Sequence, residues 1–554
     1  MKAKSIKLLP RSLPAYLRSR RTARRARAHP VRFLILLVLL GATAVFAAGD
    51  TKKSMNQADR ALRSGDFEAA EKIYREIIAK DDRNLDARLG LSRALLKQRK
   101  LQDSFDHAAR VLAVEPLSAR GHALLGASVL ASGDFRQSVE EFRTALTLNE
   151  NEAIAIAGLA MVDYYENRIG RCVSGLRRAA QLDPDEPDYV FNLGQAAARS
   201  ERYKEAADAY ERFLLIAPRT DSERRDRIRG LIDFLRYLGQ QNSLYTLDGA
   251  DRTSLTFEVP DNRPVFKVRI NGSKQYLRFV LDTGSGMSVL SEETARKLGV
   301  KSVARGGLAR AVGGGGRFEI VYGYLNSIDI GEIRINNVPV YIRHFYDETN
   351  PVDGYLGIAA IGRMVATVDY GSQVLSLSRQ RSTGVENIST GAGKPGEAAV
   401  PAGLTVPVRT TSSGFISGEV FIEGFTNPLN FIIDTGATVT VLSEKVAAMD
   451  EAQRFLRAGK IRVYGAAGVT EDVKLASLPR LAIGSNGRER IDAAILDLEP
   501  VNETAGFMQS GILGGNFLRH YRLVFDFERA FVRFESLDAD AAPKPTVPPD
   551  TTRQ

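Results

Sequence analysis

Apolar residues recur with two different spacings along the chain, and the change falls near Leu247. Between about residues 52 and 240, apolar and small residues return every three or four positions, which is typical of amphipathic helices. Beyond Leu247 the apolar runs are short and punctuated by glycine, as in PVFKVRING and LRFVLDTG. Short alternating runs of this kind predict β-strands. The pattern therefore predicts a multidomain protein, with an α-helical region followed by an all-β region.

The helical region repeats itself every 34 residues. Five small residues share one position of the repeat: Ala70, Ser104, Ser138, Cys172 and Ala206. Four positions after each of them lie Tyr74, Ala108, Phe142, Leu176 and Tyr210. A fixed period of this length predicts a solenoid of helical pairs, in which the small residue lets two helices approach. Cys172 is the single cysteine and is predicted to be a buried spacer, which excludes an internal disulfide.

The segments GDFEAAEKIYREII and GDFRQSVEEFRTALTL give this region its family resemblance. Residues 52–240 resemble tetratricopeptide repeats, and residues 222–238 are predicted to be a capping helix. The resemblance implies a protein partner bound on the repeats, either the substrate or an adaptor. A rigid spacer is the alternative. Because no titratable cluster recurs among the repeats, we expect them to take no part in bond cleavage.

The β region contains two copies of one sequence pattern. Residues 279–284, FVLDTG, match residues 431–436, FIIDTG, at an offset of 152, and VLS at 289–291 recurs at 441–443. Further on the offset drifts to 157, so that Tyr355-Leu356-Gly357 matches Ile512-Leu513-Gly514. Small loop insertions explain the drift. We therefore predict two halves, at 251–381 and 403–537, with a linker at 382–402.

The paired motifs resemble those of the retropepsin-like and pepsin-like aspartic peptidases. The resemblance implies an all-β bilobal fold and two catalytic residues, Asp282 and Asp434. It also assigns supporting roles to Thr283, Gly284, Thr435 and Gly436. The threonines would bond across the axis between the halves, and the glycines would let the backbone pass close to the carboxylates. After Gly357 the first copy reads Ile-Ala-Ala, whereas the second copy continues Gly515-Asn516-Phe517-Leu518 after Gly514, so an irregular first half is expected there.

Two aspartates explain why the motif is duplicated. Peptide hydrolysis without a metal or a covalent nucleophile needs a carboxylate to take a proton from water and a carboxylic acid to polarise the carbonyl. Two adjacent carboxyls supply both roles because they cannot both ionise, as is known for aspartic proteases. The sequence therefore predicts an aspartic endopeptidase that acts on proteins or peptides and needs no cofactor and no metal.

Glycine-rich stretches occupy the positions where hairpin flaps would close over a substrate. These flap candidates are Gly313, Gly316, Gly465 and Gly468. Ordinary tight turns are the alternative reading, since glycine serves both purposes.

Charge and hydropathy at the N-terminus indicate where the protein resides. Residues 1–32 hold eleven of the 76 Lys and Arg residues and no Asp or Glu, so the rest of the chain is nearly balanced against its 66 acidic residues. This balance excludes a nucleic-acid binder. The uncharged segment 33–49 is 17 residues long and predicts a signal anchor in the inner membrane, with the bulk of the chain extracytoplasmic. Cleavage of the segment as a signal peptide, with release to the periplasm, is the alternative.

Three alternatives to a single active site within one chain remain open. In the first, both loops persist in a catalytically inactive, peptide-binding protein. In the second, each half pairs with the same half of another chain, and in the third the protein is a scaffold that recruits partners through its repeats. The five histidines have no metal-ligand spacing. Residues 538–554 are predicted to be a disordered tail.

Overall fold

The computed structural model describes residues 50–314, 317–379 and 405–537. Contacts divide the chain into residues 1–56 and 57–554, and the description below concerns the second unit. The predicted basic segment 1–32, anchor 33–49, linker 382–402 and tail 538–554 lie outside the described residues. Within the described ranges, no helix is both long enough and apolar enough to cross a membrane.

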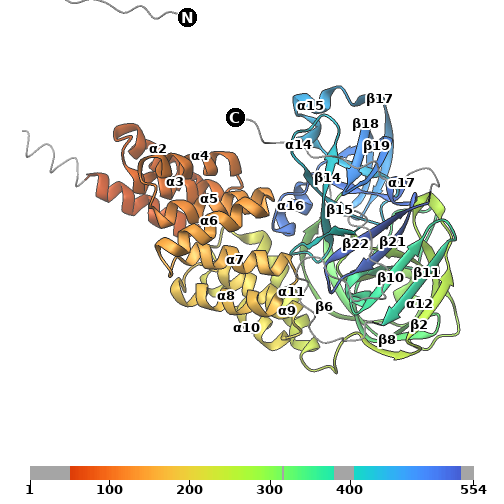
Figure 1. The fold of residues 1–554 in the computed structure, drawn as a ribbon. Helices are drawn as coiled ribbons and strands as arrows, with labels where there is room; N and C mark the ends of the chain where they lie inside the picture. Colours follow the sequence, from red (N-terminus) through yellow and green to blue (C-terminus); the bar gives the residue numbers. More distant parts are fainter. Residues whose placement is uncertain (1–49, 315–316, 380–404, 538–554) are drawn as a thin grey trace, which may run out of the picture. The chain divides into compact units, whose positions relative to one another are not determined.

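The predicted order of a helical region and a β region is confirmed (Figure 1). A helix over residues 50–64 comes first. It is followed by α2 (Phe67–Lys80), α3 (Leu85–Lys97), α4 (Leu101–Val114), α5 (Ala119–Ser132), α6 (Phe135–Leu148), α7 (Ala153–Tyr165), α8 (Ile169–Leu182), α9 (Pro187–Arg199), α10 (Tyr203–Ile216) and α11 (Ser222–Leu238). From α2 onwards, each of these helices packs against the next one along the chain.

Local sequence explains where these helices begin and how closely they pack. Side chains such as Asp66 and Asp134 accept a hydrogen bond from a first-turn backbone N–H and so cap α2 and α6. All five small residues of the 34-residue repeat, Cys172 included, are fully buried. The aromatic ring of Phe142 on α6 lies against Gly126 of α5 and Gly158 of α7, where a Cβ would overlap it. Small residues therefore set the spacing between successive helices, as the repeat predicts.

Charged side chains from α3, α9 and α11 form an ion-pair network within the array. Lys97 lies 2.6 Å from both Glu186 and Asp188, and Arg224 lies 2.8 Å from Asp188. Burial alone would raise the pKa of Asp188, but Lys97 and Arg224 hold this pKa below its ordinary value. Because α3 and α11 are far apart in sequence, the network ties the start of the array to its end.

Six strands of the first β half close into a ring. The half contains β1 (Thr246–Gly249), β2 (Arg252–Thr256), β3 (Val265–Ile270), β4 (Leu277–Asp282), β5 (Ser288–Ser291), β6 (Ser302–Arg310), β7 (Arg317–Ile330), β8 (Ile333–Arg343), β9 (Gly354–Gly357), β10 (Met364–Asp369) and β11 (Val374–Arg379). It also has three short helices, η1 (Pro260–Asn262), α12 (Glu292–Lys297) and α13 (Ile358–Ile361). The ring runs β3-β4-β9-β5-β8-β7 and closes between β7 and β3.

The second half repeats this ring strand for strand. It contains β12 (Thr405–Pro407), β13 (Arg409–Thr410), β14 (Ile416–Ile422), β15 (Leu429–Ile433), β16 (Thr440–Ser443), β17 (Leu456–Gly465), β18 (Gly468–Ile483), β19 (Asn486–Leu496), β20 (Gly511–Leu513), β21 (Tyr521–Asp526) and β22 (Phe531–Ser536). Its helices are α14 (Glu444–Ala447), α15 (Asp450–Gln453), α16 (Glu499–Ala505) and α17 (Gly515–Leu518). The ring runs β14-β15-β20-β16-β19-β18 and closes between β18 and β14. The irregularity expected after Gly357 is not observed, since α13 and α17 occupy matching places.

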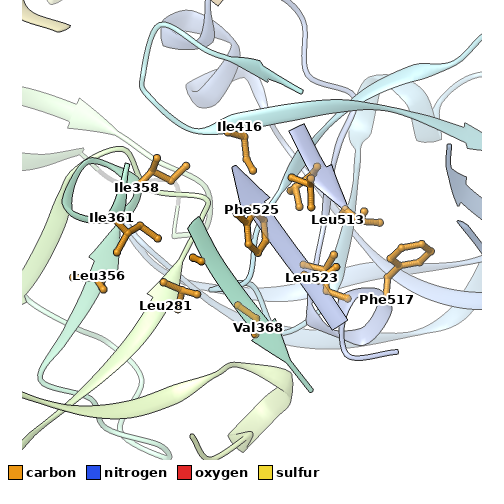
Figure 2. Packing of buried hydrophobic residues seen from close by; sticks show 14 of the residues in the cluster. Leu281, Leu356, Ile358, Ile361, Val368, Ile416, Leu513, Phe517, Leu523 and Phe525 are labelled. Carbon is orange, nitrogen blue, oxygen red and sulfur yellow. The ribbon is translucent and has the colours of Figure 1, made fainter. Parts of the chain in front are cut away.

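A central sheet joins the two halves within one chain. Its order is β12-β22-β21-β10-β11-β2, with three strands from each half, and β10 pairs antiparallel with β21. Figure 2 shows Val368, Leu523 and Phe525 of this sheet packed between core side chains such as Leu281 of the first half and Leu513 of the second. The two halves therefore share a hydrophobic core and meet inside one molecule.

The helical array packs directly against the β region. Phe507, which follows α16, is fully buried, and its ring lies 4.9 Å from Phe135 and 5.1 Å from Tyr165 in edge contacts. The backbone N–H of Met508 donates to the carbonyl of Ala131 at 2.9 Å. The sequence did not predict this packing, because the apolar ring at the interface comes from a loop with no periodicity of its own.

Candidate active site

Two matching loops carry the predicted aspartates. Asp282 ends β4 and Asp434 directly follows β15. In each half, a short strand pairs in parallel with the strand that leads to the aspartate: β9 pairs with β4, and β20 pairs with β15. This pairing holds both ends of each loop in the sheet, so the carboxyls project from rigid elements. The structure thus brings Asp282 and Asp434 together, although they are 152 residues apart in sequence.

Four hydrogen bonds between the threonines and the opposite strands lock the two loops to one another. The backbone N–H of Thr283 donates to Oγ1 of Thr435 at 3.2 Å, and the reciprocal bond measures 3.1 Å. Each hydroxyl in turn donates to a carbonyl of the other half, Thr283 to Ile433 at 2.7 Å and Thr435 to Leu281 at 2.6 Å. Both threonines are 0% exposed. The hydroxyls therefore have every partner they need, and neither half completes this network alone.

The two carboxyls approach each other across the interface between the halves, because each lies against the glycine of the opposite motif. Gly284 and Gly436 permit this approach. A Cβ on Gly284 would overlap the Asp434 carboxyl, and a Cβ on Gly436 would lie 2.9 Å from Cγ of Asp282. Both aspartates are half-buried, so the pair lies deep between the halves but keeps some exposed surface.

The two aspartates have different surroundings, which shift their pKa values by different amounts. Burial raises the pKa of Asp282, and the neighbouring Asp434 charge raises it further. Burial also raises the pKa of Asp434, but backbone N–H groups oppose the rise. Oδ1 of Asp434 accepts from Gly436 at 2.7 Å and from Ala437 at 3.1 Å, whereas Asp282 accepts from Gly284 alone at 3.0 Å. Asp434 is therefore the better stabilised anion, and its pKa is raised less than that of Asp282.

The predicted flap glycines lie at the tips of two hairpins that meet. The first flap is β6 with β7, and the second flap is β17 with β18. The N–H of Ala466 in the second tip donates to the carbonyl of Val312 in the first at 3.1 Å. A Cβ on Gly313 would lie 2.7 Å from Cα of Gly465, and one on Gly314 would lie 2.5 Å from Cα of Gly468. The tips thus approach backbone to backbone. Gly316 lies outside the described residues.

The helical array packs against the first flap. A Cβ on Gly230 of α11 would overlap the backbone of Gly306 in β6, so these two elements touch without intervening side chains. The ring of Phe234 stacks on Tyr322 of β7 with a centroid distance of 4.4 Å. Arg317 of β7 also pairs with Glu223 of α11. In contrast, most of β17 in the second flap is exposed.

The insertion in the second half is a functional feature that the sequence analysis missed. It forms α16 and the loop that carries Phe507, and it explains the drift of the offset from 152 to 157. Glu503 of α16 pairs with Arg310 of the first flap at 2.7 Å. The drift itself marked the site of the insertion, but nothing in it indicated a contact with the array or with a flap.

A cavity of about 670 Å³ lies beside the second flap and not over the aspartates. Its lining comes from α14, β18, the end of β19 and the first flap tip, and includes Leu456, Val473, Leu496 and Gly313. Neither Asp282 nor Asp434 lines it. We therefore locate the candidate site by the geometry of the aspartates and flaps. Among the described residues, no group of His, Cys, Asp and Glu is placed to hold a metal ion.

Comparisons with known proteins separate the chain into the same two regions. A family model described as aspartyl protease matches residues 266–360 and 418–517, and tetratricopeptide repeat models match 61–127 and 157–222. A thermophilic TPR protein from Thermus thermophilus is 17% identical; the match covers 34% of this chain and 99% of that one, with a TM-score of 0.29. MamA from Desulfovibrio magneticus is 20% identical, over 31% of this chain and 96% of that one, with a TM-score of 0.22. The curated proteins gave no match.

Proposed function

We propose that this chain, which carries an aspartyl protease domain behind tetratricopeptide repeats, is an aspartic endopeptidase that uses Asp282 and Asp434 as one catalytic pair. The observation that supports it best is the close approach of the two aspartate loops, in which each glycine lies against the carboxyl of the opposite half and the threonine network holds both loops in place. Raised pKa values for both aspartates favour a state with one proton between them.

The proposed reaction follows from the unequal environments of the two aspartates. Asp434, the better stabilised anion, takes a proton from a water molecule as that water attacks the carbonyl carbon of the peptide. Asp282 gives its proton to the carbonyl oxygen, which produces a tetrahedral diol. Asp434 then passes the proton that it took from water to the peptide nitrogen. As the C–N bond breaks, one hydroxyl of the diol gives its proton to Asp282, which leaves a carboxylic acid, an amine and a pair with one proton as at the start. The flap tips would close over the peptide and limit access of bulk water.

Asparagine substitutions separate this proposal from the alternative of an inactive peptide-binding protein. We expect the full chain to cleave an unfolded protein at acidic to neutral pH, and Asp282→Asn or Asp434→Asn to abolish cleavage while the protein stays folded. Peptide binding by the wild type without any cleavage, across that pH range, would favour the inactive alternative.

We also propose that the repeats recruit a protein, either the substrate or an adaptor. Arrays of this type usually serve protein–protein interaction, which supports the proposal at the level of the family. The internal network of Lys97, Glu186 and Asp188 favours a preformed array that binds without large rearrangement. Cross-linking from exposed sites on the repeats, compared between cells with the wild type and with Asp282→Asn, tests it. A cross-linked protein that accumulates uncleaved only with the variant would identify a substrate.

For localisation we propose attachment to the inner membrane through residues 33–49, with the rest of the chain outside the cytoplasm. The support is the order of a basic segment and an apolar segment in the sequence. Protease added to intact spheroplasts should degrade the repeats and the protease domain. Protection of both regions would contradict this proposal.

A further inference from the structure

Equivalent positions in the two halves of the cleft carry different chemistry. Arg343 ends β8 and pairs in register with Ser291 of β5, while Leu496 ends β19 and pairs in the same register with Ser443 of β16. The duplication therefore makes Leu496 the counterpart of Arg343. Leu496 belongs to an apolar cluster that also contains Val312 of the first flap tip and Ala437 beside the second aspartate. The corresponding position in the first half carries the positively charged side chain of Arg343.

Arg343 lies between the first flap and the catalytic aspartates. Its guanidinium carbon is 3.8 Å from the ring centroid of Phe318 on the flap strand β7. Tyr355 on β9 pairs in register with Val280 of β4, two residues before Asp282, and with Val289 of β5. Tyr355 is also the counterpart of Ile512, which lies in the apolar cluster of the second half. Because β8 and β9 flank β5, and because the counterparts Leu496 and Ile512 share one cluster with Ala437 beside Asp434, the duplication places Arg343 beside the loop of Asp282.

Arg343 has no carboxylate partner among the residues that the structure describes. None of them forms an ion pair or a side-chain hydrogen bond with it, and its side chain is half-buried. Burial lowers the pKa of Arg343, which shows that its charge is poorly solvated. A desolvated guanidinium without an anion is costly, and binding a carboxylate would remove the cost.

A second arginine approaches the same place from the helical array. Arg227 lies on α11 at the contact with the first flap, since a Cβ on Gly307 of β6 would overlap its Cα. It also lacks an ion pair within the described ranges, and burial lowers its pKa. Tyr341 lies two residues before Arg343 on the same face of β8, and it packs against the cluster that contains Phe234 of α11, the helix that carries Arg227. Burial raises the pKa of Tyr341, and the charges of Arg227 and Arg343 both oppose that rise. The nearest acidic side chain on α16, Glu503, is already paired with Arg310.

We propose that Arg343 and Arg227 form a binding subsite for an acidic side chain of the peptide substrate, at the base of the first flap. The inference rests on the proposed peptidase function and narrows its substrate class to peptides with Asp or Glu on one side of the scissile bond and an apolar residue on the other. Because Arg227 belongs to α11, the helical array would then supply one of the residues that determine which peptides the enzyme cleaves.

A peptide pool with randomised positions tests the proposal on the full chain. We expect one position to be enriched in Asp and Glu among the cleaved peptides. Two matched peptides, with Glu or Gln at that position, then measure the preference. Wild type should favour the Glu peptide in kcat/KM by roughly tenfold to a hundredfold, as expected for hydrogen bonds between charged groups.

Substitutions assign the preference to the two arginines. Arg343→Gln should lower kcat/KM far more for the Glu peptide than for the Gln peptide and so remove the preference, and Arg343→Lys should restore part of it. Arg227→Gln should have the same effect to a smaller degree. Arg229→Gln is the matched control, because Arg229 lies on the same helix but is exposed and paired with Asp226 at 2.9 Å. Equal losses for the Glu and Gln peptides would show a structural role only and overturn the proposal.

Binding measured on the Asp282→Asn variant keeps this test independent of catalysis. Fluorescence anisotropy with the labelled Glu and Gln peptides should show the same preference, and its loss with Arg343→Gln added. Selective binding without cleavage by the wild type would support the subsite and overturn the peptidase proposal. Cleavage with no preference for acidic residues at any position would support the peptidase and overturn the subsite.

Discussion

The two flap hairpins share one strand pattern but differ in what lies against them. The first flap is packed against α11 through Gly230 and Phe234, and its strands are largely covered. The second flap has no such helix against it among the described residues, and β17 is exposed along most of its length. Without the packing of α11 on the first flap, the two flap hairpins would be expected to open equally easily. Because the array packs against one half only, we expect the second flap to be the one that moves when a peptide enters.

The largest effect is expected from substituting the two aspartates. These substitutions test whether the two halves, despite their different flaps, form one catalytic unit. Asp282→Asn and Asp434→Asn should each reduce kcat by roughly a thousandfold or more, because the acid and base roles are divided between them. The double variant should be no worse than either single variant. Steady-state kinetics on a cleaved peptide measure this, with thermal melting as the control for folding.

Mixing the two single variants distinguishes pairing within the chain from pairing between chains. The central sheet joins β10 to β21 inside one molecule, so the mixture should stay inactive. Half of the wild-type activity in either single variant would mean that each half forms its own site with another chain.

The insertion that only the second half carries should contribute most of the stability of the contact with the array. Phe507→Ala removes a fully buried ring from the cluster with Phe135 and Tyr165, and should cost about 3–5 kcal/mol of unfolding free energy. Phe421→Ala is the matched control, because that ring is 49% exposed, and should cost less than about 0.5 kcal/mol. Urea unfolding followed by circular dichroism gives both values. Equal costs would show that the interface does not depend on Phe507.

Hydrogen exchange should reveal the unequal flaps directly. We expect backbone amides of β6 and β7 to exchange roughly tenfold or more slowly than those of β17 and β18, because local opening of the first flap must also break its contact with α11. Gly230→Val places a side chain where α11 and Gly306 touch, and should bring the first flap close to the rate of the second. Equal rates in the wild type would contradict the asymmetry.

The smallest effect is the dependence of stability on pH. Burial and the Asp434 charge raise the pKa of Asp282 well above its ordinary 3.8, so the native state binds a proton more tightly than the unfolded chain does. Stability from this group is therefore complete below about pH 3.8 and is lost as pH rises through the native pKa. As the pH rises above about 3.8, the melting temperature of the wild type should fall more steeply than that of Asp282→Asn. Parallel curves would show that the aspartates do not share a proton.

Sequence reasoning succeeded where a pattern repeats. The 34-residue period predicts the helical array and its buried small residues, and the pairs at an offset of 152 predict the duplicated protease half; family comparison confirms both resemblances. The catalytic roles of Asp282 and Asp434 and the role of the flaps stay predictions, now with a geometry that supports them. The expectation that the array stands apart from the site did not anticipate the packing of α11 on the first flap.

The sequence by itself determined which helices, strands and motifs each repeat contains. These features depend on hydrophobic periodicity and on adjacent residues, both of which can be read along the chain. Tertiary structure decided the rest. Gly230 meets Gly306, Phe507 packs against Phe135 of the array, and Tyr341 of β8 packs against the cluster of Phe234 on α11, although the residues of each contact are far apart in the chain. Contacts of this kind depend on how whole elements pack, and that packing is set by shape and burial over the complete fold and not by the spacing of residues along the chain.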